Sequence, residues 1–353
     1  MKFKVLWILV LLILFGNQLK AQVKYSNEFL SIGVGAASMG MGGAGIARIT
    51  DATAAYWNPA NLARMQGRWD MNLMHAEYFA GLAQYDYGAV SWRMDQNSGI
   101  GLSFIRLGID DIPNTLELID QDGNIRYDRI KTFSAADMAI LGSYARKLPV
   151  AGLQVGGSFK LVHRRTGEFA RAWGFGLDAA VSYQLNQWHF AAVARDITGT
   201  FNAWSFNTED LSEVFDLTGN ELPENSLEIT LPRLILGSSR DFRLGGQWML
   251  GAALDLHFTF DGRRHGVLVA GPITVDPYAG IEICYAEWLY VRSGLGNLQR
   301  IPSLEGQNSL SLQPNLGMGV RYRNFFIDYA LTNLGNAGVG LYSNLISLRL
   351  KIE

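Results

Sequence analysis

The chain is poor in cysteine and in charged residues, and each shortage excludes a class of protein. Its 353 residues include one cysteine, Cys284, which cannot form an internal disulfide. Asp, Glu, Lys and Arg make up 18% of the residues, below the roughly 25% of typical soluble domains. The formal net charge of −2 provides no broad basic surface for a nucleic acid. Glycine is abundant instead, with 39 residues, and this composition suits a membrane β-barrel, although a secreted all-β protein is also compatible with it.

The motifs of common catalytic, cofactor and metal sites are missing or incomplete. The sequence has no G-x-S-x-G elbow and no phosphate-binding G-K-[ST] motif. The segment 40–45 satisfies G-x-G-x-x-G, but neither a βαβ unit nor an acidic residue at the required spacing follows it. The acidic segment 120–124 begins like an EF-hand calcium loop, but Ile125 and Lys131 stand where that loop needs glycine and glutamate. The five histidines are scattered. We therefore expect no enzyme, no cofactor and no metal site.

Residues 1–21 have the organisation of a secretory signal peptide. Lys2 and Lys4 precede an apolar run from Val5 to Phe15, and a polar segment with the small residue Ala21 follows. The apolar run is about 11 residues long, too short for a bilayer core that needs roughly 20. An uncleaved anchor helix is the less favoured alternative. We expect cleavage after Ala21 and export from the cytoplasm.

From Gly67 onward, apolar side chains alternate with small or polar ones. The segments 173–185 and 248–260 show this pattern clearly, with Asp178 and Asp255 among the polar positions. A helix would instead repeat its apolar residues every three to four positions. Strands of about ten residues with one apolar face are typical of transmembrane β-barrels, whereas strands of soluble sandwiches average about five to six residues. The sequence therefore predicts an all-β, transmembrane antiparallel β-barrel rather than a soluble β-sandwich.

The alternation predicts about 14 strands. They are expected at roughly 67–79, 82–93, 98–107, 137–147, 151–163, 171–185, 188–197, 227–239, 246–260, 275–285, 288–297, 312–323, 325–333 and 343–352, with 267–270 left in a loop. Short links alternate with long ones such as 108–136 and 198–226, and barrels of this kind have short periplasmic turns and longer outer loops. This predicts a protein of the outer membrane of a Gram-negative bacterium with both termini in the periplasm.

A segment rich in glycine and alanine lies between the expected signal peptide and the first strand. We predict that residues 22–66 form a hatch, or plug, inside the barrel, and that residues 67–353 form the barrel itself. Glycine permits tight turns and a close approach to the barrel wall. The residues expected to have this structural role are Gly40, Gly42, Gly43, Gly45, Asn58, Pro59 and Ala60.

Both ends of the chain resemble one protein family. The segments 29–33, 39–47, 51–52 and 56–62, together with 326–331, 334–335 and 345–348, resemble the PorV/PorQ family of outer-membrane barrels of the type IX secretion system. More distantly, Asn58-Pro59-Ala60 resembles the hatch of FadL-type transporters, whose fourteen-stranded architecture agrees with the strand count. Two features depart from the first family: Ala36-Ala37-Ser38 stands where an arginine is usual, and the chain ends in Ile352-Glu353 rather than in an aromatic residue.

The resemblance implies a secretion accessory that works beside a translocon barrel or in a surface-attachment complex. Its partners would be the translocon, secreted cargo or surface-attachment proteins, held by the outer loops. The candidate partner-binding loop is 198–226, which contains Phe201, Trp204, Phe206 and Phe215, and packing of these aromatics onto the barrel rim is the equal alternative. The competing functions are FadL-like transport of hydrophobic small molecules across the outer membrane and a passive pore.

Overall fold

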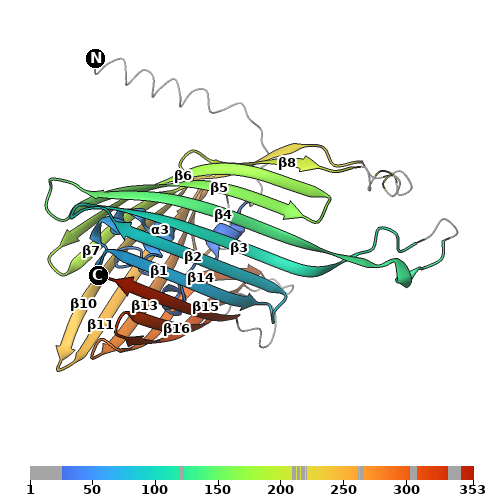
Figure 1. The fold of residues 1–353 in the computed structure, drawn as a ribbon. Helices are drawn as coiled ribbons and strands as arrows, with labels where there is room; N and C mark the ends of the chain where they lie inside the picture. The colour runs from blue at the N-terminus through green and yellow to red at the C-terminus, as the bar shows by residue number, and fades with distance from the viewer. Residues whose placement is uncertain are drawn as a thin grey trace, which may run out of the picture.

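In the computed structural model, the chain forms a closed antiparallel β-barrel with a folded segment inside it (Figure 1). The structure describes residues 26–119, 123–208, 212, 215, 219, 221–260, 262, 266–302, 308–332 and 343–353. The expected signal peptide and most of the acidic stretch 120–124 lie outside these residues. Within them, no helix is both long and apolar enough to cross a membrane.

Fourteen strands close the barrel, and the last pairs with the first from Ile352 with Trp69 to Asn344 with Glu77. Closure gives each of these fourteen strands a paired neighbour on both sides, so their ring has no free edge that could pair with other chains. The strands are β1 (Trp69–Tyr78), β2 (Ala83–Arg93), β3 (Ser98–Asn114), β4 (Lys131–Lys147), β5 (Leu153–Thr166), β6 (Ala170–Leu185), β7 (Trp188–Arg195), β10 (Arg233–Gly245), β11 (Trp248–Thr259), β13 (Ile273–Tyr285), β14 (Leu289–Pro302), β15 (Asn308–Tyr322), β16 (Phe325–Thr332) and β17 (Ser343–Ile352). The expected barrel of about 14 strands is thus confirmed.

The two ends of the barrel differ in their connections. Tight turns such as 94–97, 186–187 and 286–287 lie at the end that also holds Glu353, which we call the short-turn end. The strand ends that flank the links 115–130, 207–225 and 260–272 lie at the opposite end, which we call the long-loop end. Figure 1 shows β3 and β4 continuing past the rest of the wall at this end.

The structure corrects three predicted loops. β3 and β4 remain paired as far as Asn114 and Lys131, within the segment predicted to be the loop 108–136. Residues 268–270 form a short strand, β12 (Leu268–Ala270), which pairs with β13. The predicted loop 198–226 begins with β8 (Thr200–Phe206) and ends where β9 (Ser226–Thr230) starts. In each case backbone pairing with a neighbouring segment extends into residues that were expected to form a loop.

The wall is interrupted where β8 and β9 continue β7 and β10. Ala194 of β7 pairs with Ala179 of β6, and Phe201 of β8 pairs with Phe175, so residues 195–200 oppose a shorter stretch of β6. The extra residues turn through Asp196 and Gly199, whose φ angles are 56° and 68°. Opposite this bulge, the predicted strand 227–239 is divided at Pro232, which has no N–H to donate to a ladder.

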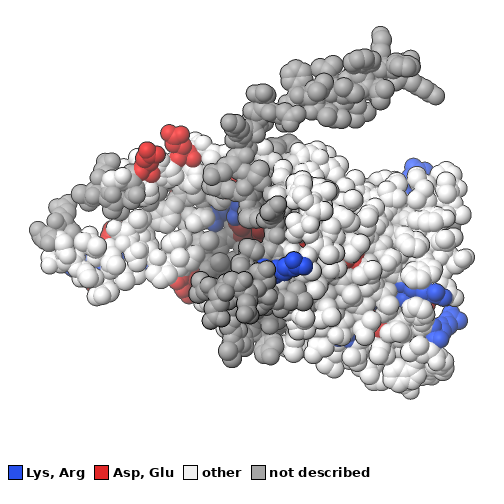
Figure 2. All heavy atoms as spheres, turned by 180° about the vertical axis from the view of Figure 1, so that it is seen from behind, with Lys and Arg blue, Asp and Glu red and all other residues white. Residues whose placement is uncertain are grey.

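The two faces of the wall separate apolar from polar side chains as the alternation predicted. Along β6, Trp173, Phe175 and Leu177 are exposed on the outer face, whereas Asp178 and Ser182 are buried on the inner face. The face shown in Figure 2 is mostly uncharged over the wall, with basic side chains gathered toward one end. This arrangement presents an apolar belt to the outside and reserves the polar groups for the lumen.

Candidate functional site: a lumen divided by a hatch

Residues 26–66 fold inside the barrel and divide its lumen. They contain only short helical elements, namely η2 (Glu28–Ser31), α2 (Ala36–Gly40), α3 (Ala54–Trp57) and η3 (Pro59–Arg64). Helices of this length are not stable alone, so packing against the wall must hold them. The Tyr85 hydroxyl donates to the Phe29 carbonyl at 2.9 Å, and the Trp57 indole donates to the Val34 carbonyl at 2.9 Å. All four of these side chains are buried. We call residues 26–66 the hatch.

The hatch runs through the barrel rather than lying at one end of it. Its first described residues lie in the long-loop half, where the Ser26 hydroxyl donates to Glu228 at 3.1 Å and the Asn27 amide donates to Thr230 at 2.9 Å. Its last residues join β1 at the short-turn end. The expected periplasmic location of the N-terminus concerns residues before Ser26 and stays a prediction.

Two of the predicted hatch glycines pack directly against glycines of the wall. A Cβ on Gly40 would lie 2.8 Å from the Gly317 Cα, and a Cβ on Gly42 would lie 2.8 Å from the Leu295 nitrogen and 3.0 Å from the Gly294 carbonyl carbon. Gly42 also has a φ of 72°, which disfavours a side chain. Close contact between two backbones therefore requires glycine on both the hatch and the strands.

The other predicted hatch residues form its turns. Gly43 and Gly45 have φ angles of 78° and 122°. The buried Asn58 side chain accepts from the Ala60 N–H at 3.1 Å and so caps η3, and Pro59 occupies the first helical position, where its missing N–H costs nothing. Ala60 lies against the wall, since a Cβ on Gly156 would lie 2.5 Å from the Ala60 nitrogen. The Asn58 amide also donates to the Ser182 hydroxyl at 2.9 Å, which ties the turn to β6.

Several inward-facing wall residues anchor the hatch backbone, and the sequence pattern did not single out most of them. Ser347 accepts from the Ala36 N–H at 2.8 Å, and Asp70 accepts from the Ala52 N–H at 3.1 Å. Arg195 donates to the Tyr56 carbonyl at 3.1 Å, and its guanidinium lies 4.5 Å from the centre of the Tyr56 ring. In the sequence, such a residue could be recognised only as a polar residue at an inward position of a predicted strand. Asp255 was recognised in this way, but the hatch residues that it contacts, Gly45 and Ile46, were not.

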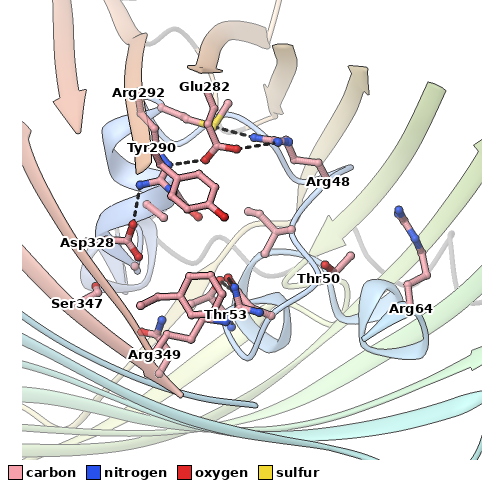
Figure 3. A pocket seen from close by; sticks show the side chains of 18 of the residues that line it. Arg48, Thr50, Thr53, Arg64, Glu282, Tyr290, Arg292, Asp328, Ser347 and Arg349 are labelled. Atoms are coloured by element: carbon pink, nitrogen blue, oxygen red, sulfur yellow. Dashed lines mark hydrogen bonds and ion pairs between the residues drawn. The ribbon is translucent and has the colours of Figure 1, made fainter. Parts of the chain in front are cut away.

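On the short-turn side of the hatch lies a polar chamber of about 620 Å³ (Figure 3). An ion-pair network crosses it from the hatch to the wall: Arg48 contacts Glu282 at 3.0 Å, and Arg292 contacts Glu282 and Asp328 at 2.6 Å each. Glu282 and Arg292 therefore both face the lumen, where they pair with each other. Arg64 stands apart from the network in Figure 3 and bonds to the Ala47 carbonyl and the His189 ring instead.

The two hatch arginines that line this chamber differ in their electrostatic surroundings. Burial alone would lower the pKa of Arg48, but the carboxylates of Glu282 and Asp241 outweigh it and raise the pKa. Burial lowers the pKa of Arg64, and Asp241 offsets this only in part. Arg48 is thus the hatch arginine that pairs with carboxylates of the wall, Glu282 at 3.0 Å and Asp241 at 3.2 Å.

On the long-loop side lies a second chamber of about 480 Å³ with a more apolar lining. The hatch forms its base, and the apolar residues around it include Ile32, Met39, Trp57, Leu107 and Ile235. Polar side chains line the same space in no smaller number, and the charged residues Glu28, Arg195, Arg233 and Asp276 are among them. Four other polar residues of the lining have a buried atom without a hydrogen-bond partner among the described residues: His257 Nε2, Thr259 Oγ1, Gln313 Nε2 and Asn315 Oδ1. Buried polar atoms are normally paired, so these four atoms are exceptions among the described residues.

The structure corrects the candidate partner-binding loop. Phe201, Trp204 and Phe206 belong to strand β8 of the wall, whose alternation resumes after the bulge at Gly199. Phe201 packs edge-on against Phe175 with ring centres 4.3 Å apart, and the Arg164 guanidinium lies 5.0 Å from the Trp204 ring. Phe215, the fourth member, lies outside the described strands and is half-buried. A partner-binding role for the four residues stays a prediction.

Within the residues that the structure describes, no group of three or more His, Cys, Asp and Glu side chains is arranged to hold a metal ion. Two lumen carboxylates, Glu282 and Asp70, are instead engaged with arginine and with a backbone N–H group, respectively.

Comparison with known proteins identifies the fold. No model of a protein family and no curated protein sequence matches the chain. Among solved structures, it is similar to the toluene transporter TodX of Pseudomonas putida, with a TM-score of 0.56, 14% identity and coverage of 91% of this chain and 99% of that chain. The toluene transporter TbuX of Ralstonia pickettii gives a TM-score of 0.55 with the same identity and coverage. The monoaromatic hydrocarbon channel CymD gives 0.52 and 14% identity, covering 90% of this chain and 96% of that chain. The chain therefore shares the barrel fold of these transporters over nearly its whole length.

Proposed function

We propose that this protein is an outer-membrane transporter that admits small hydrophobic molecules from the long-loop end. The observation that carries the proposal is the chamber of about 480 Å³ on that side of the hatch. Its volume falls within the roughly 300–1,000 Å³ typical of small-molecule sites, and its lining combines apolar side chains such as Met39, Trp57 and Ile235 with polar ones. The fold shared with the hydrocarbon transporters supports the same reading.

The chamber also suggests which hydrophobic molecules it accepts. Polar side chains such as His257, Gln313 and Asn315 line the chamber beside the apolar ones, and a pure hydrocarbon could form no hydrogen bond with any of them. A site with buried polar atoms disfavours a ligand that cannot pair with them. We therefore expect preference for an apolar molecule that carries one hydroxyl or carbonyl group.

The proposed orientation follows the lengths of the connections. The long links would face the exterior and the short turns the periplasm, as in other barrels of this class. Molecules would then enter the chamber first and meet the hatch at its base, where Gly43 and Trp57 lie. Passage would require a movement of the hatch, because its backbone packs directly on the wall at Gly40 and Gly42.

Uptake by cells tests this function. Cells that express the protein in the outer membrane should take up labelled benzyl alcohol faster than cells without it, and faster than they take up toluene. Ile235, which is 3% exposed and lines the chamber, should block uptake when replaced in Ile235→Trp. The matched control is Ile281→Trp, since Ile281 is 47% exposed on the outer face of β13. Equal uptake with and without the protein, or normal uptake by Ile235→Trp, would refute the proposal.

The resemblance to the PorV/PorQ family stays a separate prediction. Its expected partners are a translocon barrel, secreted cargo or surface-attachment proteins, and mild purification from native membranes should recover one of them if the resemblance extends to function. One argument for such partners was an aromatic outer loop, but Phe201 and Trp204 belong to strand β8.

A further inference from the structure

The outer face of β5, β6 and β8 changes character from one row of paired residues to the next. Leu161, Phe175 and Phe201 form one row across the three strands, and all three are apolar. The next row toward the long loops pairs His163 with Trp173, whose rings lie 4.2 Å apart. Trp173 is 54% exposed. An aromatic row above an apolar belt is typical of the boundary between hydrocarbon and headgroups.

The row above this boundary places two arginines opposite each other. Arg165 of β5 pairs directly with Arg171 of β6, and Arg171 pairs on its other side with Ser205 of β8. Both arginines are exposed. Like charges directly opposite each other destabilise a pair of strands. The position therefore carries a cost that an anion between the two guanidinium groups would remove.

The described part of the chain does not supply this anion. Arg165 donates to the Gly167 carbonyl at 2.8 Å, and neither arginine forms an ion pair with a described residue. Glu168, in the turn between β5 and β6, lines the same hollow without an ion pair to either of them within the described residues. By contrast, the adjacent inward-facing Arg164 is paired with Asp137 at 2.8 Å.

The two arginines line a hollow of about 660 Å³ on the outer side of the wall. His163, Trp173 and Ser205 line it as well, so it extends from the cationic row down to the aromatic row. Two residues along a strand span roughly 7 Å. A molecule held by the arginines would therefore have its apolar part beside Trp173 and Phe175, on the surface that faces the hydrocarbon.

We propose that Arg165 and Arg171 bind a phosphate group of a lipid in the outer leaflet of the membrane. Guanidinium groups match phosphate with paired, charge-assisted hydrogen bonds, and the Ser205 hydroxyl adds a donor in the same row. A lipid is the expected source of the phosphate because the hollow is continuous with the apolar outer face. The inference rests on the membrane placement and orientation of the barrel and is independent of transport through its lumen.

Native mass spectrometry of the detergent-solubilised protein tests the site. The probes are lipid A with its phosphates, lipid A from which they have been removed, and inorganic phosphate. The wild type should retain phosphorylated lipid A, and Arg165→Gln/Arg171→Gln should bind it at least about tenfold more weakly, as expected for the loss of charge-assisted hydrogen bonds. Arg243→Gln is the matched control, since Arg243 is an exposed arginine near the short-turn end of β10. Arg171→Lys, which keeps the charge but loses the planar fork, should fall between the wild type and the double variant.

Thermal stability gives a second measurement, in which loss of an arginine should raise the melting temperature of the lipid-free protein although it weakens lipid binding. Without lipid, Arg171→Gln should melt at a higher temperature than the wild type, because it removes the like-charge pair. With phosphorylated lipid A, the melting temperature of the wild type should rise more than that of the variant.

Equal retention of both forms of lipid A, or equal retention by the wild type and the double variant, would overturn the proposal. If inorganic phosphate competes for the site as effectively as lipid A does, the phosphate group bound there need not come from a lipid, and that part of the proposal is refuted. The chamber variant Ile235→Trp should lose uptake but retain phosphorylated lipid A as the wild type does. The transport proposal and the lipid proposal can therefore be refuted independently.

Discussion

The buried carboxylate of Asp255 in β11 accepts hydrogen bonds from two consecutive N–H groups of the hatch, Gly45 at 2.7 Å and Ile46 at 3.0 Å. Asp255 is 0% exposed. Successive N–H groups that converge in a turn form a favourable site for an anion. The φ of 122° at Gly45 allows this convergence. A wall carboxylate thereby fixes the turn of a segment about 210 positions away in the chain.

The first prediction concerns this contact. Asp255→Ala should lower the free energy of unfolding by about 1–3 kcal/mol, because two buried N–H groups lose their acceptor. It should also loosen the hatch. Urea unfolding of the detergent-solubilised protein measures the first effect, and current through planar bilayers measures the second. The wild type should conduct very little, since the hatch fills the lumen between the two chambers.

Asp86→Ala provides the control for the first prediction. Asp86 contacts His75 at 2.7 Å and Arg106 at 3.1 Å, which are wall residues rather than hatch residues. Its replacement should leave the conductance at the wild-type level. If both variants conduct equally, the Asp255 contact does not hold the hatch in place.

The second prediction separates close packing from backbone strain. Gly42 and Gly81 both have positive φ, 72° and 88°, so alanine at either position costs roughly 1–2 kcal/mol in strain. A Cβ at Gly42 would also approach the Leu295 nitrogen to 2.8 Å, whereas a Cβ at Gly81 would meet no atom within 4 Å. Gly42→Ala should therefore impair folding more than Gly81→Ala. The measurement is the heat-modifiable shift of the folded barrel in gel electrophoresis, and equal shifts would show that Gly42 is not packed against the wall.

Much of the wall could be predicted from the sequence because the type of each side chain, apolar or polar, indicates which face of the strand it occupies. The inward position of Asp178 and the outward position of Phe175 follow from a period of two, and period is a local property. The broken strand at Asp196 was not predictable in this way. A bulge changes the phase of the alternation, and the aromatics Phe201 and Trp204 after it were therefore assigned to a loop.

The site was less predictable than the wall because it depends on contacts between distant segments. Gly42 could be recognised as a residue suited to close approach, but its partners Gly294 and Leu295 could not be named without the barrel register. The same holds for Arg195, whose inward direction follows from the pattern but whose acceptor, the Tyr56 carbonyl, does not. Pairing in three dimensions, rather than residue type, decides which inward polar groups hold the hatch and which face a chamber.

The third prediction concerns a buried cation at the interruption of the wall. Lys160 of β5 contacts Asp178 at 2.8 Å and also contacts Asp196, and all three side chains are less than a tenth exposed. Lys160→Met would leave Asp178 without this cation and would leave Asp196 with the Arg233 guanidinium at 3.6 Å. Removal of one partner from a buried ion pair is expected to cost about 3–5 kcal/mol, because an uncompensated charge stays buried.

Denaturation in urea tests this prediction, and a compensated variant makes the cause identifiable. Lys160→Met combined with Asp178→Asn and Asp196→Asn removes the buried charges together and should recover most of the lost stability. Lys147→Met is the matched control: Lys147 lies at the exposed short-turn end of β4 and donates to the Gln96 carbonyl, so its replacement should change stability little. If the compensated variant is no more stable than Lys160→Met, the lysine acts through packing rather than charge. Asp196 lies between β7 and β8. If Lys160→Met is as stable as Lys147→Met, the contacts of Lys160 with Asp178 and Asp196 do not stabilise this part of the wall.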